Sequence, residues 1–200
     1  MNPDNRKRAM RTAAALLCAL LVTVLAACGS GDSSADPGTD PPDYSSALDK
    51  APPKLKALYE QGGTLAPGGL DGFSEQLAAV EGYPVVVNNW ASWCGPCRTE
   101  WPWFQRAAAS SSSPSTPMKA TRSRLSAAAR TFLDDHPVPY PSFADPGKEV
   151  GTEVGATLVG GFPNTLIYDA SGKLLYAHQG VYPDEATLEA DIRKYALGES

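Results

Sequence analysis

The sequence predicts an α/β domain, and three stretches of the chain indicate this class. Residues 85–90, Val-Val-Val-Asn-Asn-Trp, begin with an apolar β-branched run that favours a strand buried on both faces. Residues 98–109 follow with the pattern of a helix. Towards the carboxyl end we expect two strands joined by a turn, and then an amphipathic helix, over residues 164–169, 173–179 and 184–197. A chain of 200 residues has the length of a single domain with appendages.

Two cysteines stand where the first of these strands leads into the helix. Cys94 and Cys97 are three residues apart, so a helix places them on one face. Cys94, the outer cysteine, is expected where unpaired backbone N–H groups and the positive end of the helix dipole favour a thiolate. A thiolate attacks disulfides, and Cys-X-X-Cys motifs lower a cysteine pKa from about 8.5 to roughly 3.5–7.5. Cys97 can then close on Cys94 and expel a substrate thiol, which predicts redox chemistry.

A cysteine pair at this spacing also occurs in zinc sites and in structural disulfides. A closed structural zinc site needs four ligands, whereas this chain has no second Cys-X-X-Cys pair, and His136 and His178 lack the usual histidine spacing. A structural disulfide does not account for the far more specific string Trp-Cys-Gly-Pro-Cys at the start of a helix. We therefore expect no metal and no cofactor other than a redox-active disulfide.

Residues 90–97, Trp-Ala-Ser-Trp-Cys-Gly-Pro-Cys, resemble the active site of thioredoxin-like proteins. The resemblance covers roughly residues 50–197. It is greatest to extracytoplasmic, membrane-tethered thiol–disulfide reductases, including those that serve cytochrome c maturation. The resemblance implies the thioredoxin fold, a mixed central sheet flanked by helices, with Cys94 as the attacking cysteine and Cys97 as the resolving one.

The same resemblance implies residues that shape the site and bind substrate. Within the motif these are Trp93, Gly95 and Pro96. The string Gly-Gly-Phe-Pro-Asn around Phe162 and Pro163 is similar to the cis-proline turn of the family. An ordinary trans turn is the alternative. In a cis turn the backbone groups of Phe162 would face the cysteines, free to pair with an extended substrate.

Two polar residues near the motif are candidates for handling protons. Glu100, three residues after Cys97, matches an acid that several extracytoplasmic members place beside the cysteines. A carboxylate raises a nearby thiol pKa by like-charge repulsion and can shuttle its proton; the alternative is an ordinary acidic residue near a helix start. Asn88 falls where cytoplasmic thioredoxins carry a buried aspartate. Because an amide cannot titrate, a strand asparagine satisfied by hydrogen bonds is the simpler interpretation.

The amino terminus predicts export and a lipid anchor. Basic residues precede an apolar run over 13–27, the pattern of a secretory signal peptide. The run ends Leu-Ala-Ala-Cys-Gly, which resembles the lipobox of bacterial lipoproteins, so cleavage would leave Cys28 to carry lipid. An uncleaved anchor helix is the alternative, but the run is shorter than the roughly 17–25 residues of a membrane span. We expect a signal peptide over 1–27 and a lipid-anchored protein on the extracytoplasmic face of the cell membrane.

The residues after the lipobox predict a tether and a domain. Residues 28–49, the lipidated cysteine and a stretch rich in Gly, Ser, Asp and Pro, are expected to form a flexible linker to a domain over 50–200. After processing, Cys94 and Cys97 would be the only free thiols. Structural disulfides are common in an oxidising compartment, but here no other thiol would remain to form one. We therefore expect the single cysteine pair to serve thiol–disulfide exchange.

Together these features predict thiol–disulfide exchange, in the direction of disulfide reduction, on exported proteins. Apocytochrome c is one candidate substrate, a membrane thiol donor would return the electrons, and we expect a monomer. The net charge of −5 argues against a nucleic-acid partner. Two other functions stay open: a catalytically silent binding module, and a thioredoxin-like peroxidase, which is disfavoured because such enzymes usually lack a Cys-Gly-Pro-Cys pair.

One strand of the expected sheet is doubtful. The fold needs a strand beside residues 85–90, but the available stretch, residues 110–121, is rich in serine and proline, which are poor strand formers. We expect this stretch to fail as a strand. If its serines use TCN codons, a reading frame one base earlier encodes apolar residues followed by an acidic turn. An out-of-frame translation between two compensating indels is therefore our hypothesis for its origin.

Overall fold

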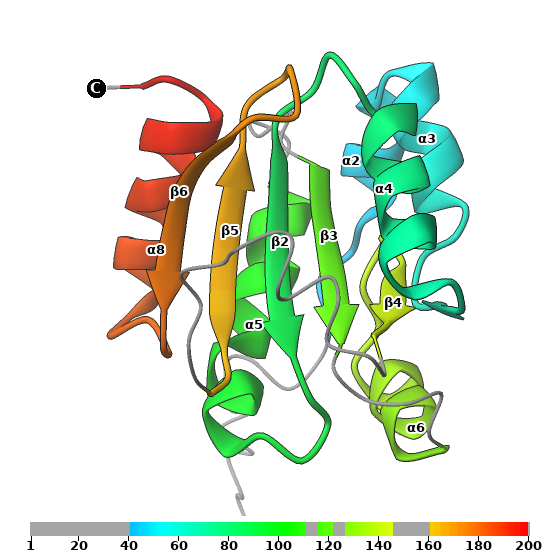
Figure 1. Cartoon of the computed structure of the whole chain (residues 1–200), viewed down its shortest axis with the longest axis vertical. Coiled ribbons are helices and arrows are strands. Elements are labelled where there is room, and N and C mark those ends of the chain that lie inside the picture. Colours follow the sequence, from blue (N-terminus) through cyan, green and yellow to red (C-terminus); the bar gives the residue numbers. More distant parts are fainter. Residues whose placement is uncertain (1–40, 111–115, 122–126, 146–160, 200) are drawn as a thin grey trace, which may run out of the picture. The chain divides into compact units, whose positions relative to one another are not determined.

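Within the residues that the structure describes, six strands form a mixed sheet in the unit Asp40–Ser200 (Figure 1). The computed structural model describes residues 41–110, 116–121, 127–145 and 161–199. The strands are β1 Leu65–Ala66, β2 Val85–Trp90, β3 Thr116–Thr121, β4 Ser142–Ala144, β5 Asn164–Tyr168 and β6 Leu174–Gln179. In the order β1-β4-β3-β2-β5-β6, the first four run parallel, whereas β5 is antiparallel to both β2 and β6.

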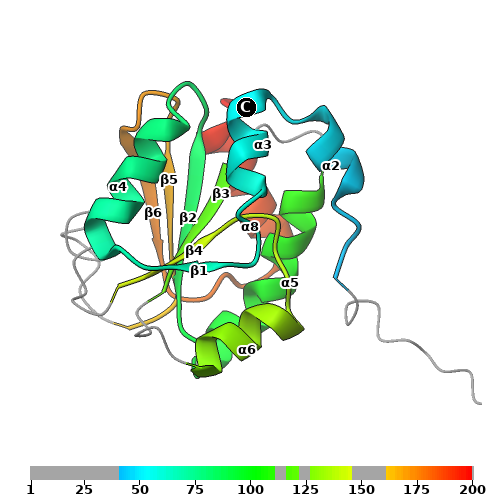
Figure 2. The same ribbon diagram turned by 90° about the vertical axis from the view of Figure 1, so that its right-hand side faces the viewer.

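Helices pack on both faces of this sheet (Figure 2). In chain order they are α2 Ser45–Lys50, α3 Pro53–Tyr59, α4 Gly69–Ala79, α5 Gly95–Ala109, α6 Ala127–Asp135, α8 Glu185–Asp191 and the π-helical turn η1 Ile192–Ala196. Helices α3 and α4 share a core with Val85 and Val87 of β2. Val86 instead packs with α5, α8 and η1. Successive side chains of a strand point to opposite faces, so the continuous apolar run of β2 is buried on both sides, as predicted.

Strand β3 forms where the sequence led us to expect none. It pairs in parallel with β2 along its whole length, so the prediction that residues 110–121 fail as a strand was wrong. A proline removes one ladder hydrogen bond, but Pro117 is the second residue of β3, and pairing with β4 begins only at Lys119. Near Pro117 the strand therefore has one neighbour instead of two, which limits the loss. The out-of-frame hypothesis concerns the gene, and resequencing remains its test.

Several boundaries differ from the expected ones. The sequence over residues 65–73 shows no clear helix or strand pattern, but these residues contain β1 and the start of α4, which Gly68 caps in a left-handed conformation (φ 118°). Helix α2 overlaps the end of the predicted linker, and the Tyr44 hydroxyl before it donates to the Pro137 carbonyl at 3.2 Å. The sequence over 147–158 has a weak helical pattern, and these residues lie outside those that the structure describes. The two strands and the helix expected towards the carboxyl end agree with β5, β6 and the pair α8 and η1 to within a few residues.

An aromatic cluster fixes α5 and α6 against the end of β2. The Trp90 ring lies 4.7 Å from the Trp101 ring and 5.2 Å from the Phe132 ring, measured between centroids. Trp90 and Trp101 are almost fully buried. The Trp101 indole N–H donates to the His136 carbonyl at 3.2 Å, so its polar edge is also satisfied. Because α5 starts with the cysteine motif, this cluster fixes the helix that carries the motif.

Candidate active site

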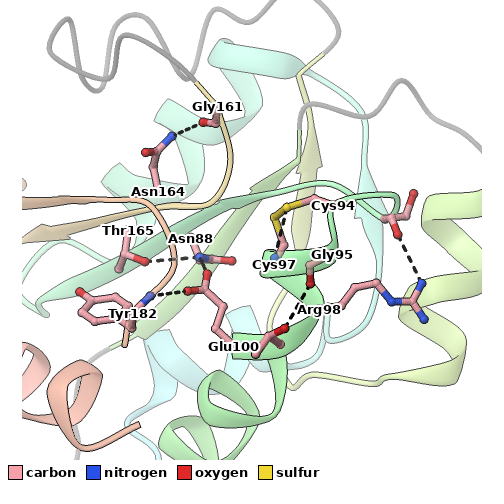
Figure 3. Close-up of a disulfide and its surroundings, with 12 residues drawn as sticks. Asn88, Cys94, Gly95, Cys97, Arg98, Glu100, Gly161, Asn164, Thr165 and Tyr182 are labelled. Atoms are coloured by element: carbon pink, nitrogen blue, oxygen red, sulfur yellow. Dashed lines mark hydrogen bonds between the residues drawn. A yellow bond between two sulfur atoms is a disulfide. The ribbon is translucent and has the colours of Figure 1, made fainter. Parts of the chain in front are cut away.

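Cys94 and Cys97 form a disulfide at the amino end of α5 (Figure 3). Their Cα atoms are 5.3 Å apart. Cys94 caps the helix, and its sulfur accepts a hydrogen bond from the Cys97 backbone N–H at 3.2 Å. The helix begins at Gly95, three residues earlier than expected, and the predicted delivery of both cysteines to its first turn is confirmed. After reduction, the same N–H and the helix dipole would stabilise a thiolate on Cys94.

An exposed aromatic edge lies beside the disulfide. Trp93 is 73% exposed, and its ring packs edge-on against Phe162 with 5.6 Å between centroids. The Phe162–Pro163 bond is cis, which confirms the predicted turn. Strand β5 follows this turn and runs antiparallel to β2, with Asn164 opposite Asn89. The cis-proline turn and the cysteine motif, far apart in sequence, therefore lie at the same end of the sheet.

A buried polar cluster surrounds Glu100, which lies one helical turn after Cys97 (Figure 3). Glu100 Oε1 accepts a hydrogen bond from Asn88 Nδ2 at 2.8 Å, and Oε2 accepts one from the Tyr182 backbone N–H at 3.3 Å. Asn88 Nδ2 also donates to Thr165 Oγ1 at 3.3 Å. Asn88 is therefore a hydrogen-bonded strand residue through its Nδ2, as expected, whereas its buried Oδ1 has no hydrogen-bond partner among the described residues. A buried carboxylate is costly unless its oxygens have donors, and both oxygens of Glu100 have one.

Comparison with known proteins decides the family. The profile of the Redoxin family matches residues 49–192, almost three quarters of the chain. The chain belongs to the Redoxin family. The thiol:disulfide interchange protein DsbE of Yersinia pestis is 30% identical to it over 148 residues, 72% of this chain and 70% of that protein.

Other Redoxin-family relatives agree with this assignment. A DsbE homolog from Paracoccus denitrificans, also named a thiol:disulfide interchange protein, is 36% identical over 96 residues, 48% of this chain and 50% of the relative. The crystal structure of a protein described as a thiol:disulfide interchange protein DsbE from Chlorobium tepidum matches with a TM-score of 0.52 and 29% identity, over 60% of this chain and 84% of that one. The solved structures confirm the predicted thioredoxin fold. The chain spans about half the length of the first curated relatives it matches.

Two contributors to the polar cluster of this Redoxin-family chain were missed by sequence reasoning. Thr165 stands two residues after Pro163, and its place in the strand expected over 164–169 was the available signal; the structure pairs it with Asn88. Tyr182 contributes only its backbone N–H to Glu100. Every residue except proline has such a group, so no residue type could have revealed it.

A positive charge lies on the exposed side of the motif. Arg98 follows Cys97, and its Nη1 donates to the Ser92 carbonyl at 3.4 Å (Figure 3). Its guanidinium also lies over the Phe132 ring, 5.1 Å from the centroid. These two contacts connect the loop after β2 to α5 and α6 and hold a cation beside the cysteines.

Among the described residues there is no group of three or more His, Cys, Asp or Glu that could hold a metal ion. In the same part of the chain, every helix is too short or too polar to cross a membrane. The predicted signal peptide and Cys28 lie outside the described residues.

Proposed function

We propose that this Redoxin-family chain is a thiol–disulfide oxidoreductase that reduces disulfides in exported proteins. The observation that carries the proposal is the Cys94–Cys97 disulfide at the start of α5, next to a buried carboxylate and an exposed tryptophan. The relatives named thiol:disulfide interchange proteins support the same chemistry. Apocytochrome c is a candidate substrate, because the sequence motif resembles that of reductases serving cytochrome c maturation.

The proposed reaction has two exchange steps. In the reduced protein, the Cys94 thiolate attacks one sulfur of the substrate disulfide and releases the other as a thiolate, which takes up a proton. The Cys97 thiol then loses its proton and attacks the Cys94 sulfur. The second substrate sulfur leaves and is protonated, and the Cys94–Cys97 disulfide forms again. Two electrons pass from the cysteine pair to the substrate, and a membrane thiol donor would restore them.

Glu100 is our proposed proton acceptor for Cys97. The two residues lie one turn apart on α5, and both are buried. Side chains three residues apart in a helix are neighbours. A carboxylate in this position disfavours a permanent thiolate on Cys97 and can take the proton when the mixed disulfide is resolved.

Replacing Glu100 with Gln should lower the pH at which Cys97 becomes reactive, by about one unit, because the like charge is removed. The measurement is alkylation of Cys97 against pH in the reduced protein carrying Cys94→Ser. Glu75→Gln, an exposed position on α4, is the matched control and should change nothing. An unchanged profile in the Glu100 variant would remove Glu100 from the proposed mechanism.

Substrate would bind beside the disulfide, at the surface formed by Trp93 and Phe162. Trp93 offers an exposed ring, and Gly95 and Pro96 are exposed in the first turn of α5. The space beside Gly95 is open, since a Cβ added there would meet nothing within 4 Å. Phe162 and Pro163 line the other side of the site through the contact of Phe162 with Trp93. An extended peptide can pair with backbone groups here and bring its disulfide to Cys94.

Insulin reduction in the presence of dithiothreitol tests the proposed function. An oxidoreductase accelerates precipitation of the reduced insulin chains, whereas a silent binding module leaves the uncatalysed rate unchanged. Consumption of hydrogen peroxide is measured beside it, because a peroxidase would consume peroxide at the expense of the same thiols. Activity against peroxide alone would contradict the proposal.

We further propose that the protein is a monomer held at the extracytoplasmic membrane face by lipid on Cys28. The support is the lipobox-like string and the polar linker over residues 28–49. Two or more acyl chains make such anchoring stable, whereas one chain is marginal.

The wild-type protein should therefore sediment with membranes, and Cys28→Ala should leave the signal peptide uncleaved or missort the protein. The intact mass of the mature protein is the measurement. Cys18→Ala, within the predicted signal peptide, is the control and should retain the lipid. A mature protein that starts at another residue and carries no lipid would refute the anchor.

A further inference from the structure

We propose that His178 and Tyr182 are positioning residues for Glu100. Their stacked rings hold the segment between β6 and α8 in the place where its backbone donates to the Glu100 carboxylate. The inference rests on the proposed function and deepens it, because it adds a second layer of residues behind the proton acceptor.

The stack is close and nearly parallel. The His178 and Tyr182 ring centroids are 3.8 Å apart, and the ring planes differ by 10°. Tyr182 is 1% exposed. The buried Nε2 of His178 has no hydrogen-bond partner among the described residues. His178 therefore contacts Tyr182 through the face of its ring and not through a hydrogen bond from Nε2.

The segment after β6 is joined to two parts of the site. The Tyr182 N–H donates to Glu100 Oε2 at 3.3 Å, and the Gly180 N–H donates to the Pro163 carbonyl at 3.0 Å. Gly180 turns the chain with φ 89°, a conformation that favours glycine. One short segment therefore contacts both the proposed proton acceptor and the proposed substrate-binding turn.

The sheet connects His178 to the same cluster by a second route. In the pairing of β5 with β6, His178 lies directly opposite Thr165. Opposed residues of an antiparallel pair share a face, and Thr165 accepts a hydrogen bond from Asn88, which also donates to Glu100. His178 is thus the β6 neighbour of Thr165, which belongs to the hydrogen-bond network of the Glu100 carboxylate.

Tyr182 itself does not titrate in the range where thiols react. Burial raises its pKa far above the usual value, and the charges of Asp191, Tyr176 and Glu100 act in the same direction. The phenol stays neutral. A change in the pH dependence of Cys97 on altering this pair therefore does not come from titration of the tyrosine.

The test compares two substitutions of His178 in the reduced protein carrying Cys94→Ser. His178→Leu keeps much of the side-chain volume but lacks an aromatic face, whereas His178→Phe keeps a ring that can stack. We expect Leu to lower the alkylation midpoint of Cys97 by about half a pH unit, part of the effect of removing the carboxylate. Phe should restore the wild-type midpoint. Leu175→Ala, an exposed position on the same strand, is the control and should have no effect.

The decisive measurement repeats His178→Leu in the Glu100→Gln background. A residue that acts through Glu100 should give no further shift there, whereas a general loosening of the fold would shift the midpoint equally in both backgrounds. Equal shifts, or a Phe variant that behaves like Leu, would overturn the proposal. Tyr182→Leu removes the stack from the other side and should match His178→Leu, which covers the case that one variant fails to fold. Failure of insulin reduction by the wild-type protein would refute the proposed function, a result distinct from these midpoints.

Discussion

Cys94→Ser should reduce insulin reduction to the uncatalysed rate and trap no substrate, whereas Cys97→Ser should accumulate mixed disulfides. Cys94 caps α5, so backbone N–H groups and the helix dipole stabilise its thiolate. Without Cys97 the mixed disulfide on Cys94 has no resolving thiol. Non-reducing gels of the two variants after incubation with an exported substrate protein are the measurement.

One measurement tests whether Cys94 is the attacking cysteine and Cys97 the resolving one. Mass mapping of the reduced wild-type protein after brief alkylation below pH 7 should find Cys94 modified before Cys97. The opposite order would make Cys97 the attacking thiol. The double serine variant, which can neither attack nor resolve, supplies the baseline for both experiments.

Trp90→Ala should have the largest effect on stability, lowering the free energy of unfolding by about 3–5 kcal/mol. Trp90 is fully buried and packs against Trp101 and Phe132, so its removal leaves a cavity between β2, α5 and α6. Typical domains have only about 5–15 kcal/mol of stability in total. Urea unfolding of the oxidised protein is the measurement.

Trp93→Ala is the matched control for that experiment. The residue type is the same and only three positions away, but Trp93 is 73% exposed. Its loss should change the free energy of unfolding by less than about 0.5 kcal/mol, while insulin reduction falls because substrate loses the ring it packs against. Equal destabilisation by both variants would contradict the described core.

The predictions succeeded where one physical signal dominated. The apolar run of β2 predicted a buried strand correctly, because a strand buried on both faces has a continuous apolar sequence instead of alternating apolar and polar residues. The cysteine motif and the cis-proline turn were predicted because their residues resemble those of thioredoxin-like proteins. Glu100 was singled out by its match to an acid of the similar extracytoplasmic proteins, and the structure places it in a buried, hydrogen-bonded position, while its role in proton transfer stays a prediction. These features define the centre of the sheet and the cysteine site.

The failures have a different physical origin. Strand β3 consists of residues with weak strand propensity, and it forms beside β2, where pairing along the whole strand outweighs local preference. The start of α4 depends on the left-handed backbone conformation of Gly68, which the preceding residues do not predict. The Tyr182 N–H belongs to a backbone that only the folded chain brings to Glu100. For β3 and for the Tyr182 N–H, a tertiary contact decides the local structure.

The interior position of β2 determines how the molecule opens. This strand is hydrogen-bonded to β3 on one side and β5 on the other, and all six of its residues are buried. Exposing its amides requires two ladders to break at once, so the free energy of that opening approaches the free energy of global unfolding. Cys94 stands four residues beyond Trp90, the last residue of the strand. We therefore expect the amides of β2 to be among the slowest to exchange in the described residues, so that the reactive sulfurs follow a rigid segment through successive rounds of oxidation and reduction.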